Sequence, residues 1–193
     1  MIVIGVPVDK NFTIDVRTAA YCSAEAMHPN VKWGYASSRE AGVGRSTFAY
    51  RALKNPDVTH LYFMDSDVVP PEGTLSKLLD HDVPIVAGIY PMCTDMPCWS
   101  FKTTAGWENK DLSLPKGLTE TTAIGGSTLL VKREVFEKME RPWFKIVYKA
   151  IDEEGRAYDE GEDEYFSRLA REAGYKIMID PTIICTHYNK RAL

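Results

Sequence analysis

Two aspartates at the end of an apolar stretch are the residues of this chain best suited to chemistry. Asp65 and Asp67 flank Ser66 and follow the apolar run 61–64. In extended backbone, side chains two residues apart point to the same side. Paired carboxylates at the end of a buried strand need a cationic partner, because an isolated buried charge is costly. Mg²⁺ or Mn²⁺ takes oxygen ligands of this kind and grips a diphosphate through its open positions. The alternative is a solvated acidic turn.

Two further segments carry groups that could complete such a site. Glu162 and Asp163 open a predicted helix after Gly161, where the helix dipole stabilises a carboxylate. Helix capping is one role for them, and a general base is another. His187 follows an apolar stretch, and beside two aspartates its neutral imidazole could be a third metal ligand. Taken alone, a histidine in such a position is more often structural.

An arginine and two glycines form a weaker group of candidates. The segment 42–47 departs from the P-loop pattern, because Arg39 and Arg45 occupy the Gly and Lys positions of that pattern. Arg45 near a helix start could still contact a phosphate, and so could Arg39. Gly125 and Gly126 permit close backbone approach to a ligand, although a tight bend is the simpler explanation. Three histidines have no partner visible in the sequence: His28, His60 and His81.

The elements that must position these residues alternate between strands and helices over the first 90 residues. This order is typical of a parallel sheet with right-handed crossovers, in which ligands bind outside the carboxyl ends of the strands. Asp65 and Asp67 stand at such an end. Apolar runs predict strands at 2–8, 31–36, 60–65 and 84–90, and helical periodicity predicts helices at 13–27, at 44–53 and after Pro70.

The second half has weaker periodicity. Residues 91–118 predict loops and short hairpin strands, because they are rich in Pro, Gly and Trp. Residues 142–157 predict an irregular lid or acceptor loop with Trp143 and Phe144 exposed at its rim; the alternative is that these rings pack in the core. The other predicted elements are an apolar segment at 121–132, helices at 134–139 and 162–173, and strands at 176–179 and 182–185.

Bulk properties narrow the class of protein. The 193 residues suit one domain, and 45% hydrophobic and 26% charged residues are typical of a globular chain. A net charge of −4 offers no basic surface for nucleic acid. No apolar run reaches the ~20 residues of a membrane span and no signal peptide opens the chain, so we expect a soluble, cytoplasmic protein. The cysteines lack zinc-binding spacing, although Cys93 and Cys98 could pair.

Taken in chain order, these segments resemble the GT-A glycosyltransferases, especially the inverting family 2-like enzymes. The resemblance covers nearly the whole chain, and the ordered co-occurrence of its short motifs is more specific than any one of them. It implies one GT-A domain, with a Rossmann-like nucleotide-binding half (1–90) around a mostly parallel sheet and an acceptor-side, metal-completing half (91–193) with small antiparallel strands. The motifs are Val6-Pro7, Arg45, Asp65-Ser66-Asp67, the strand 84–90, Gly125-Gly126, Gly161-Glu162-Asp163, the segment 173–176 and His187.

The resemblance also implies an activity: transfer of a sugar, with inversion, from a UDP- or GDP-sugar to a hydroxyl of a glycan or another acceptor. Asp65-Ser66-Asp67 would be the DxD motif that binds Mn²⁺ or Mg²⁺ on the donor diphosphate, and His187 would complete the metal site. Asp163, supported by Glu162, would deprotonate the acceptor. The other implied contacts are Val6, Pro7, Val8 and Arg45 with the nucleotide, and Gly125 and Gly126 with the donor sugar or acceptor.

Two other classes of protein share some of these features. Sugar-1-phosphate nucleotidyltransferases also combine an α/β sheet with acidic metal ligands, but a Gly-rich basic loop follows their first strand, where this chain has Val8-Asp9-Lys10-Asn11. A non-catalytic sugar-nucleotide-binding module would not need carboxylates in all three segments. Within the transferases, retention stays open beside inversion, because retaining GT-A enzymes share the metal motif.

Overall fold

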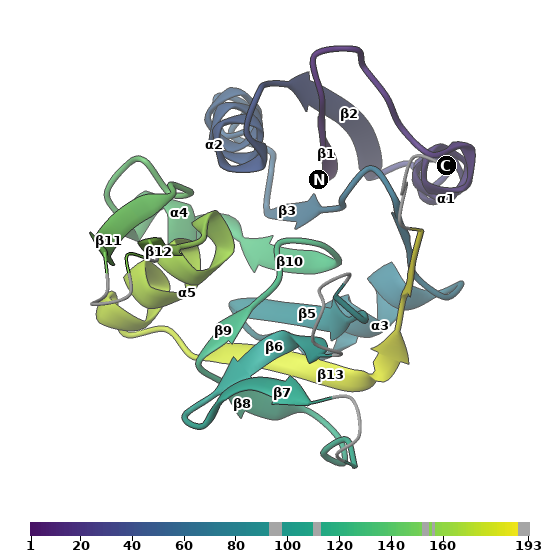
Figure 1. The fold of residues 1–193 in the computed structure, drawn as a ribbon. Coiled ribbons are helices and arrows are strands. Elements are labelled where there is room, and N and C mark those ends of the chain that lie inside the picture. Colours follow the sequence, from purple (N-terminus) through teal and green to yellow (C-terminus); the bar gives the residue numbers. More distant parts are fainter. Residues whose placement is uncertain (93–97, 110–112, 152–154, 156, 189–193) are drawn as a thin grey trace.

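A seven-stranded sheet forms the centre of the molecule in this computed structural model, which describes residues 1–92, 98–109, 113–151, 155 and 157–188. Five strands run in one direction, whereas β10 and β8 run against them. The expected α/β class with a mostly parallel central sheet is therefore confirmed (Figure 1). In spatial order the strands are β2 (Val31–Ser37), β1 (Ile2–Val8), β3 (His60–Phe63), β10 (Leu129–Lys132), β5 (Ile85–Ile89), β13 (Ile177–Ile184) and β8 (Thr119–Thr121).

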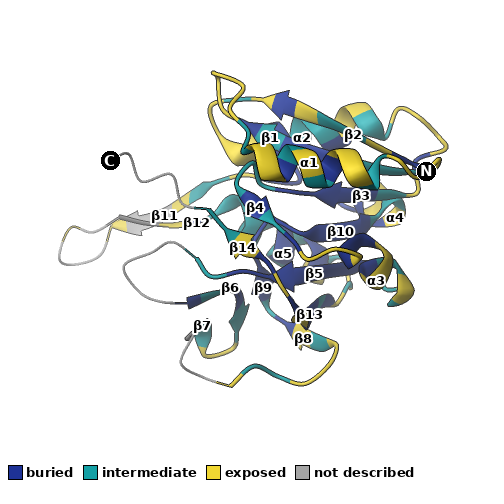
Figure 2. Cartoon of the chain, turned by 90° about the vertical axis from the view of Figure 1, so that its right-hand side faces the viewer, coloured by how far each residue is buried: buried dark blue, intermediate teal, exposed yellow. Residues whose placement is uncertain are grey.

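Helices cover both faces of this sheet, because successive strand residues point to opposite sides. Tyr62 and Leu130 belong to the apolar cluster under α1 and α3, whereas Leu61 and Val131 belong to the one under α2, α4 and α5. Figure 2 shows the buried strands between helices that are exposed on their outer sides. The helices are α1 (Val16–Glu25), α2 (Ala41–Ala52), α3 (Thr74–Asp80), α4 (Arg133–Lys138) and α5 (Glu162–Glu172).

Three small antiparallel sheets lie beside the central one, as expected for the second half. The first joins β7 (Gly106–Asn109), β6 (Cys98–Thr103) and β9 (Ala123–Ile124). The second is a hairpin of β11 (Val147–Ile151) and β12 (Ala157–Glu160). The third pairs β4 (Val68–Val69) with β14 (Thr186–His187), so a segment near residue 187 lies against the one that follows Asp67.

The order of strands differs from the simplest parallel arrangement. The strand predicted at 84–90 does not pair with the one at 60–65, because β10 lies between β3 and β5 and is antiparallel to both. The ranges 1–90 and 91–193 therefore share one sheet. The strands predicted at 176–179 and 182–185 form a single strand, β13, with a register shift between Ile179 and Ile184.

The prediction that Trp143 and Phe144 are exposed at a rim is wrong. Their exposed fractions are 5% and 2%, and both belong to the main core. Phe144 stacks on Phe166 with 4.7 Å between ring centroids, and the Trp143 indole N–H donates to the carbonyl of Phe136 at 3.1 Å. These contacts bury two large apolar rings and give the indole N–H a hydrogen-bond acceptor. Most of the segment that follows is the β11–β12 hairpin, on which Tyr148 is 80% exposed.

Two further expectations concern cysteines and membranes. The pairing of Cys93 with Cys98 lies outside the described residues, because Cys93 is not among them. In the described ranges, no helix has the length and apolar character needed to cross a membrane.

Candidate active site

The two aspartates lie in a turn rather than in a strand. β3 ends at Phe63, and the amide of Val68 donates to the carbonyl of Asp65 at 3.4 Å, which closes a turn over 65–68. The extended backbone predicted through these residues is therefore wrong, and the two carboxylates meet different partners. Asp65 bonds Arg45, whereas Asp67 faces His187.

His187 lies beside Asp67 because β14 pairs with β4, which places His187 opposite Val68. The Nε2 atom of His187 is 3.7 Å from Oδ1 of Asp67, and its Nδ1 is 3.0 Å from the carbonyl oxygen of Pro91. The nearby carboxylate of Asp67 raises the pKa of His187, although burial opposes it. An imidazole that donates from Nδ1 to a carbonyl keeps Nε2 for a ligand, as metal-binding histidines do.

Arg45 is enclosed in the protein on helix α2. Only 2% of its surface is exposed, so the guanidinium that was expected to touch a nucleotide faces protein side chains. Its Nη1 donates to Oε1 of Glu162 at 2.7 Å, and its Nη2 donates to Oδ1 of Asp65. The arginine therefore joins the 65–68 turn to the first residue of α5.

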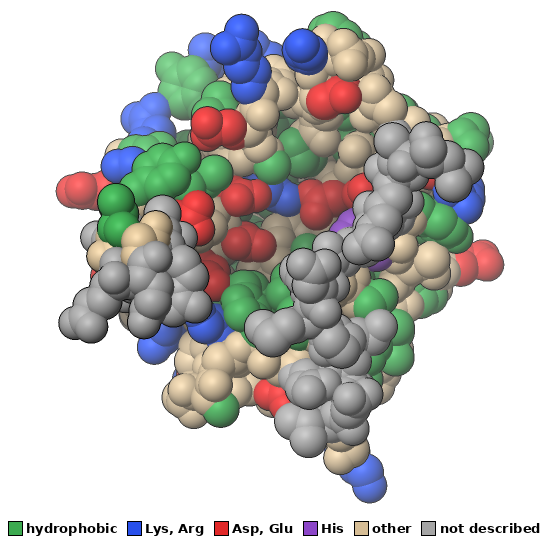
Figure 3. Space-filling view, viewed as in Figure 1, with side chains coloured by type: hydrophobic (Ala, Val, Ile, Leu, Met, Phe, Trp, Pro, Cys, Tyr) green, Lys and Arg blue, Asp and Glu red, His purple; other side chains and the backbone are tan. Residues whose placement is uncertain are grey.

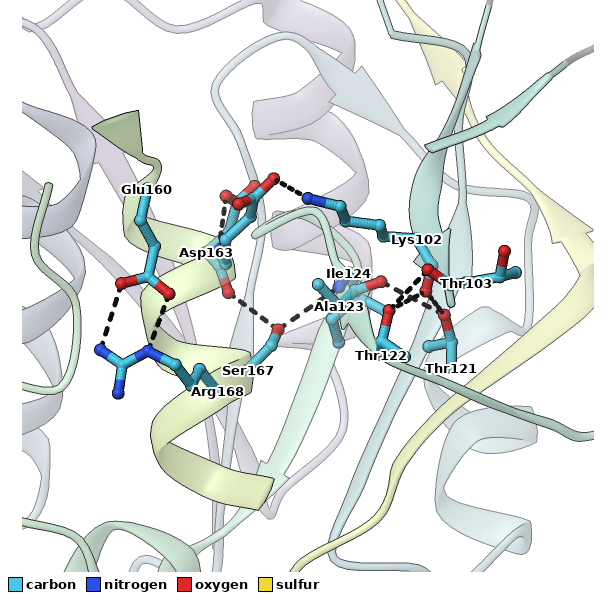
Figure 4. A network of polar contacts seen from close by, with 11 residues as sticks. Lys102, Thr103, Thr121, Thr122, Ala123, Ile124, Glu160, Asp163, Ser167 and Arg168 are labelled. Carbon is cyan, nitrogen blue, oxygen red and sulfur yellow. Dashed lines mark hydrogen bonds and ion pairs between the residues drawn. The ribbon is translucent and has the colours of Figure 1, made fainter. Parts of the chain in front are cut away.

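Helix α5 carries three carboxylates in its first turn, and its start is fixed by contacts with two strands (Figure 4). Ser167 donates its hydroxyl to the carbonyl of Asp163 at 2.8 Å and accepts the amide of Ile124, in β9, at 3.3 Å. Lys102 of β6 pairs with Glu164 at 3.2 Å. This network sets where Asp163 stands relative to the ends of the strands.

The Asp163 carboxyl combines a bond from a first-turn amide of α5 with a raised proton affinity. Its Oδ1 accepts the amide N–H of Glu164 at 2.8 Å, and the described residues offer no hydrogen bond to Oδ2. Burial and the charge of Glu162 raise the pKa of Asp163 to about 6, although Arg45 opposes them. A carboxylate with this pKa is ionised at neutral pH and still holds a proton well, which suits a general base.

The two predicted glycines meet side chains of the site itself. A Cβ on Gly125 would lie 2.2 Å from the hydroxyl oxygen of Tyr90, and one on Gly126 would lie 2.5 Å from Cζ of Arg45. The next residue, Ser127, bonds the amide of Asp65 through its hydroxyl at 2.9 Å. Close backbone approach is therefore the reason for glycine here, and the groups approached are Tyr90 and Arg45.

Hollows open at the ends of β1 and β2, where the nucleotide base was expected. Pro7 and Val8 line one of about 200 Å³ together with Ser38 and Arg39. A second, of about 330 Å³, shares Ser38 and Arg39. Val6 is fully buried in the core beneath them. Arg39 was predicted only as a phosphate contact and Ser38 was not predicted, because the proximity of the two strand ends depends on their pairing.

Carboxylates gather in the hollowed centre of this face, as Figure 3 shows. Within the described residues, no three His, Cys, Asp or Glu side chains are arranged to hold a metal ion. Asp67 and His187 nevertheless bring a carboxylate oxygen and an imidazole nitrogen to one place. Mg²⁺ and Mn²⁺ take few protein ligands when substrate phosphates supply the others, so this pair fits a cation shared with a diphosphate. Asp65 is engaged by Arg45 in this conformation.

Comparison with known proteins bears on the fold. No family model and no curated protein sequence matches the chain. Among solved structures, A197 from STIV is similar with a TM-score of 0.71, at 21% identity, over 98% of this chain and 86% of that one. GalNAc-T7, crystallised with UDP, GalNAc and Mn²⁺, is similar with a TM-score of 0.57, at 13% identity, over 98% of this chain and 44% of that one. The central sheet, the small antiparallel sheets and these likenesses show that the chain has a GT-A-like, glycosyltransferase-type fold.

Proposed function

We propose that this protein is a metal-dependent glycosyltransferase that moves a sugar from a nucleoside-diphosphate sugar to an acceptor hydroxyl. One observation carries the proposal: three segments far apart in sequence meet at one end of a GT-A-like sheet. They are the 65–68 turn, β14 with His187, and the start of α5 with Asp163, and Arg45 links the first to the third. Ligands of open α/β sheets bind at this end.

The donor would lie across the strand ends, with its base in the hollow beside Pro7 and Val8 and its diphosphate near Asp67 and His187. Arg39 lines the same hollow and offers a guanidinium to a phosphate oxygen. Asp67 and His187 would hold Mn²⁺ or Mg²⁺, which when bound offsets the negative charge that develops on the leaving diphosphate.

Asp163 would serve as the general base. The acceptor oxygen forms its bond to the anomeric carbon while the bond from that carbon to the diphosphate breaks. The acceptor proton passes to Oδ2 of Asp163, since Oδ1 accepts the amide of Glu164. A single displacement of this kind inverts the anomeric configuration. Glu162 is held by Arg45 at 2.7 Å and borders the same space.

The test is an assay with UDP- and GDP-sugars in the presence of Mn²⁺ or Mg²⁺. We expect release of nucleoside diphosphate, by hydrolysis or transfer, and NMR of the product gives its anomeric configuration. Release of pyrophosphate from a nucleoside triphosphate and a sugar 1-phosphate would instead indicate a nucleotidyltransferase. Nucleotide binding without turnover of any donor would indicate a binding module.

The metal assignment has a separate test. Asp67→Asn and His187→Ala should each weaken the Mn²⁺-dependent affinity for UDP or GDP at least about tenfold, because each removes a ligand. Asp57→Asn, an exposed aspartate away from the site, is the control. Unchanged affinity by calorimetry in the two site variants would contradict the assignment.

A further inference from the structure

We propose that Arg45 is a positioning residue, which ties Asp65 on the donor side to Glu162 on the acceptor side and thereby sets the place of Asp163. The catalytic part of this inference rests on the proposed function, whereas the tie itself rests on contacts within the chain. The sequence suggested a different role for Arg45, that of a nucleotide contact.

The two ends of the guanidinium bind carboxylates from two separate segments. Nη1 donates to Glu162 at 2.7 Å, and Nη2 donates to Asp65. Arginine suits this bridge because its planar fork presents donors in fixed directions, whereas lysine offers one compact charge on a flexible stem. A lysine at this place would have to reach both carboxylates from a single nitrogen, so it would not hold them at the spacing that Nη1 and Nη2 of Arg45 set.

Two glycines let the tie form. A Cβ on Gly126 would lie 2.5 to 2.7 Å from Cζ, Nη2 and Nε of Arg45, so the guanidinium lies directly against this backbone. A Cβ on Gly42, one turn before Arg45 in α2, would lie 2.8 Å from Cβ of Glu162. The arginine and its partner are therefore enclosed by backbone on two sides, which leaves little freedom for either side chain.

Arg45 is also the cation that this group of acids shares. Besides its two partners Asp65 and Glu162, it lowers the pKa of Asp163, against burial and the charge of Glu162. Without the guanidinium, the carboxylates of Asp65, Glu162 and Asp163 would repel each other.

The Nε atom of Arg45 is buried and, among the described residues, has no hydrogen-bond partner. An unsatisfied buried donor destabilises a fold. A residue selected for stability alone would therefore not bring an unpaired N–H to this place. Arginine has a reason to be here if it holds the 65–68 turn and the start of α5 in fixed positions relative to each other.

The experiment compares Arg45→Lys, Arg45→Met and Gly126→Ala with two matched controls. Arg51→Met changes an exposed arginine of the same helix, and Gly34→Ala adds a Cβ whose nearest neighbour is 3.7 Å away. For each variant we would measure the melting temperature, the affinity for UDP or GDP with Mn²⁺ by calorimetry, and kcat and KM for the donor.

We expect Arg45→Lys and Gly126→Ala to fold and to lose about 10²-fold in kcat, because a shift of about 1 Å in a catalytic group has an effect of this size. Affinity for the nucleotide and KM for the donor should stay at their wild-type values. A loss of affinity with unchanged kcat would overturn the proposal in favour of a nucleotide contact. Folded variants with unchanged kcat and affinity would overturn it in favour of an ion pair with a purely structural role.

A double-mutant cycle separates this inference from the proposed function, because it needs no activity. We would measure the melting temperatures of Arg45→Met, Glu162→Gln and the double variant, with Arg45→Lys in place of Arg45→Met if the latter does not fold. Non-additive shifts support the tie, and additive shifts overturn it. If the wild-type protein turns over no donor, the proposed function fails, and the cycle still decides whether the tie exists.

Discussion

Asp163 is half-buried and Asp180 is buried, and the pKa values of their carboxyl groups are shifted in opposite directions. Asp180, in β13, is 2% exposed and accepts the amide of Thr182 at 2.9 Å, Nε2 of His81 at 2.9 Å and Nζ of Lys77 at 3.3 Å. Burial raises its pKa, but the bonds from Thr182 and His81 outweigh burial and lower it to about 2. Asp163 has one amide donor and an acidic neighbour, and its pKa rises to about 6.

The difference separates a carboxylate that holds structure from one that is available for chemistry. Asp180 has donors on both oxygens and joins α3 to β13 through Lys77 and His81. Asp163 keeps one oxygen without a donor in the described part of the chain, at some cost to the fold. Proteins commonly accept such a cost where a group must react.

The largest expected effect is on turnover. Asp163→Asn keeps the volume and the bond to the Glu164 amide but removes the proton affinity, so kcat should fall about 10²-fold or more while donor and Mn²⁺ affinities stay unchanged. Asp180→Asn, the matched change at the other carboxylate, should leave kcat unaltered in folded protein. Full activity in Asp163→Asn would reduce Asp163 to a helix cap and transfer the role of base to Glu162.

The next effect is on stability. Asp180→Ala leaves His81 and Lys77 without their carboxylate, so the free energy of unfolding should fall by about 3 kcal/mol in urea titrations. Asp80→Ala, at an exposed aspartate of helix α3, which also carries Lys77, is the control and should change the free energy of unfolding little. A loss below about 1 kcal/mol for Asp180→Ala would show that the contacts of Asp180 with Lys77 and His81 do not stabilise the fold.

The pH dependence of stability should have opposite signs at the two residues. The lowered pKa of Asp180 stabilises the fold above pH ~4 by about 2 kcal/mol, and this contribution is lost as pH falls through 2. The raised pKa of Asp163 means that the folded chain binds its proton more tightly than the unfolded chain. Its contribution to stability is fully present below pH ~4 and is lost as pH rises through 6.

Compared with the wild type, Asp163→Asn should therefore have a higher melting temperature at pH 8 than it does at pH 4. The gain is equivalent to about 2 kcal/mol after allowance for partial exposure. Asp180→Asn should lower the melting temperature at pH 8. Thermal unfolding of both variants across this pH range checks the signs, and shifts of equal sign would contradict the opposite pKa shifts of the two carboxyl groups. In the wild type, kcat should rise with pH through about 6, as Asp163 ionises.

The smallest effect is expected from Gly42→Ala. The new Cβ would lie 2.8 Å from Cβ of Glu162 and displace that side chain, so kcat should fall about tenfold. Alanine favours a helix over glycine by about 1 kcal/mol, which offsets the strain in the melting temperature. Val43→Ala, at an exposed neighbour in α2, is the control. Unchanged kcat in Gly42→Ala would show that the position of Glu162 does not matter.

Most of the elements could be predicted from the sequence, because their apolar periodicity is local. The helices of the described residues and the strands β1, β2, β3 and β5 lie close to the predicted ranges, whereas the two-residue strand β4 was not predicted. The place of β10 between β3 and β5 could not be predicted, since strand order depends on contacts distant in sequence. The same holds for Trp143 and Phe144, whose segment has no periodicity although its rings reach the core.

The site was predictable as a set of residues but not as a set of contacts. The three acidic or histidine-bearing segments were visible in the sequence, and the structure places His187 beside Asp67. The burial of Arg45 was not visible, because nothing local distinguishes it from the exposed Arg51. His81 showed no partner in the sequence. The signal that was missed is Asp180-Pro181-Thr182, in which an Asp two residues before a Thr, at a strand broken by Pro, indicates a side chain bonded to backbone.

The place of β10 has a consequence for how the protein is made. β3 and β5 each pair with β10 along one edge, so the first 92 residues alone would leave both of these apolar edges open. At a synthesis rate of about 5–20 residues per second, these edges stay unpaired for seconds, until Lys132 has left the ribosome. Open edges of this kind recruit other chains. A fragment that stops before β10 should therefore aggregate, and a chaperone that shields nascent strands would act in this interval.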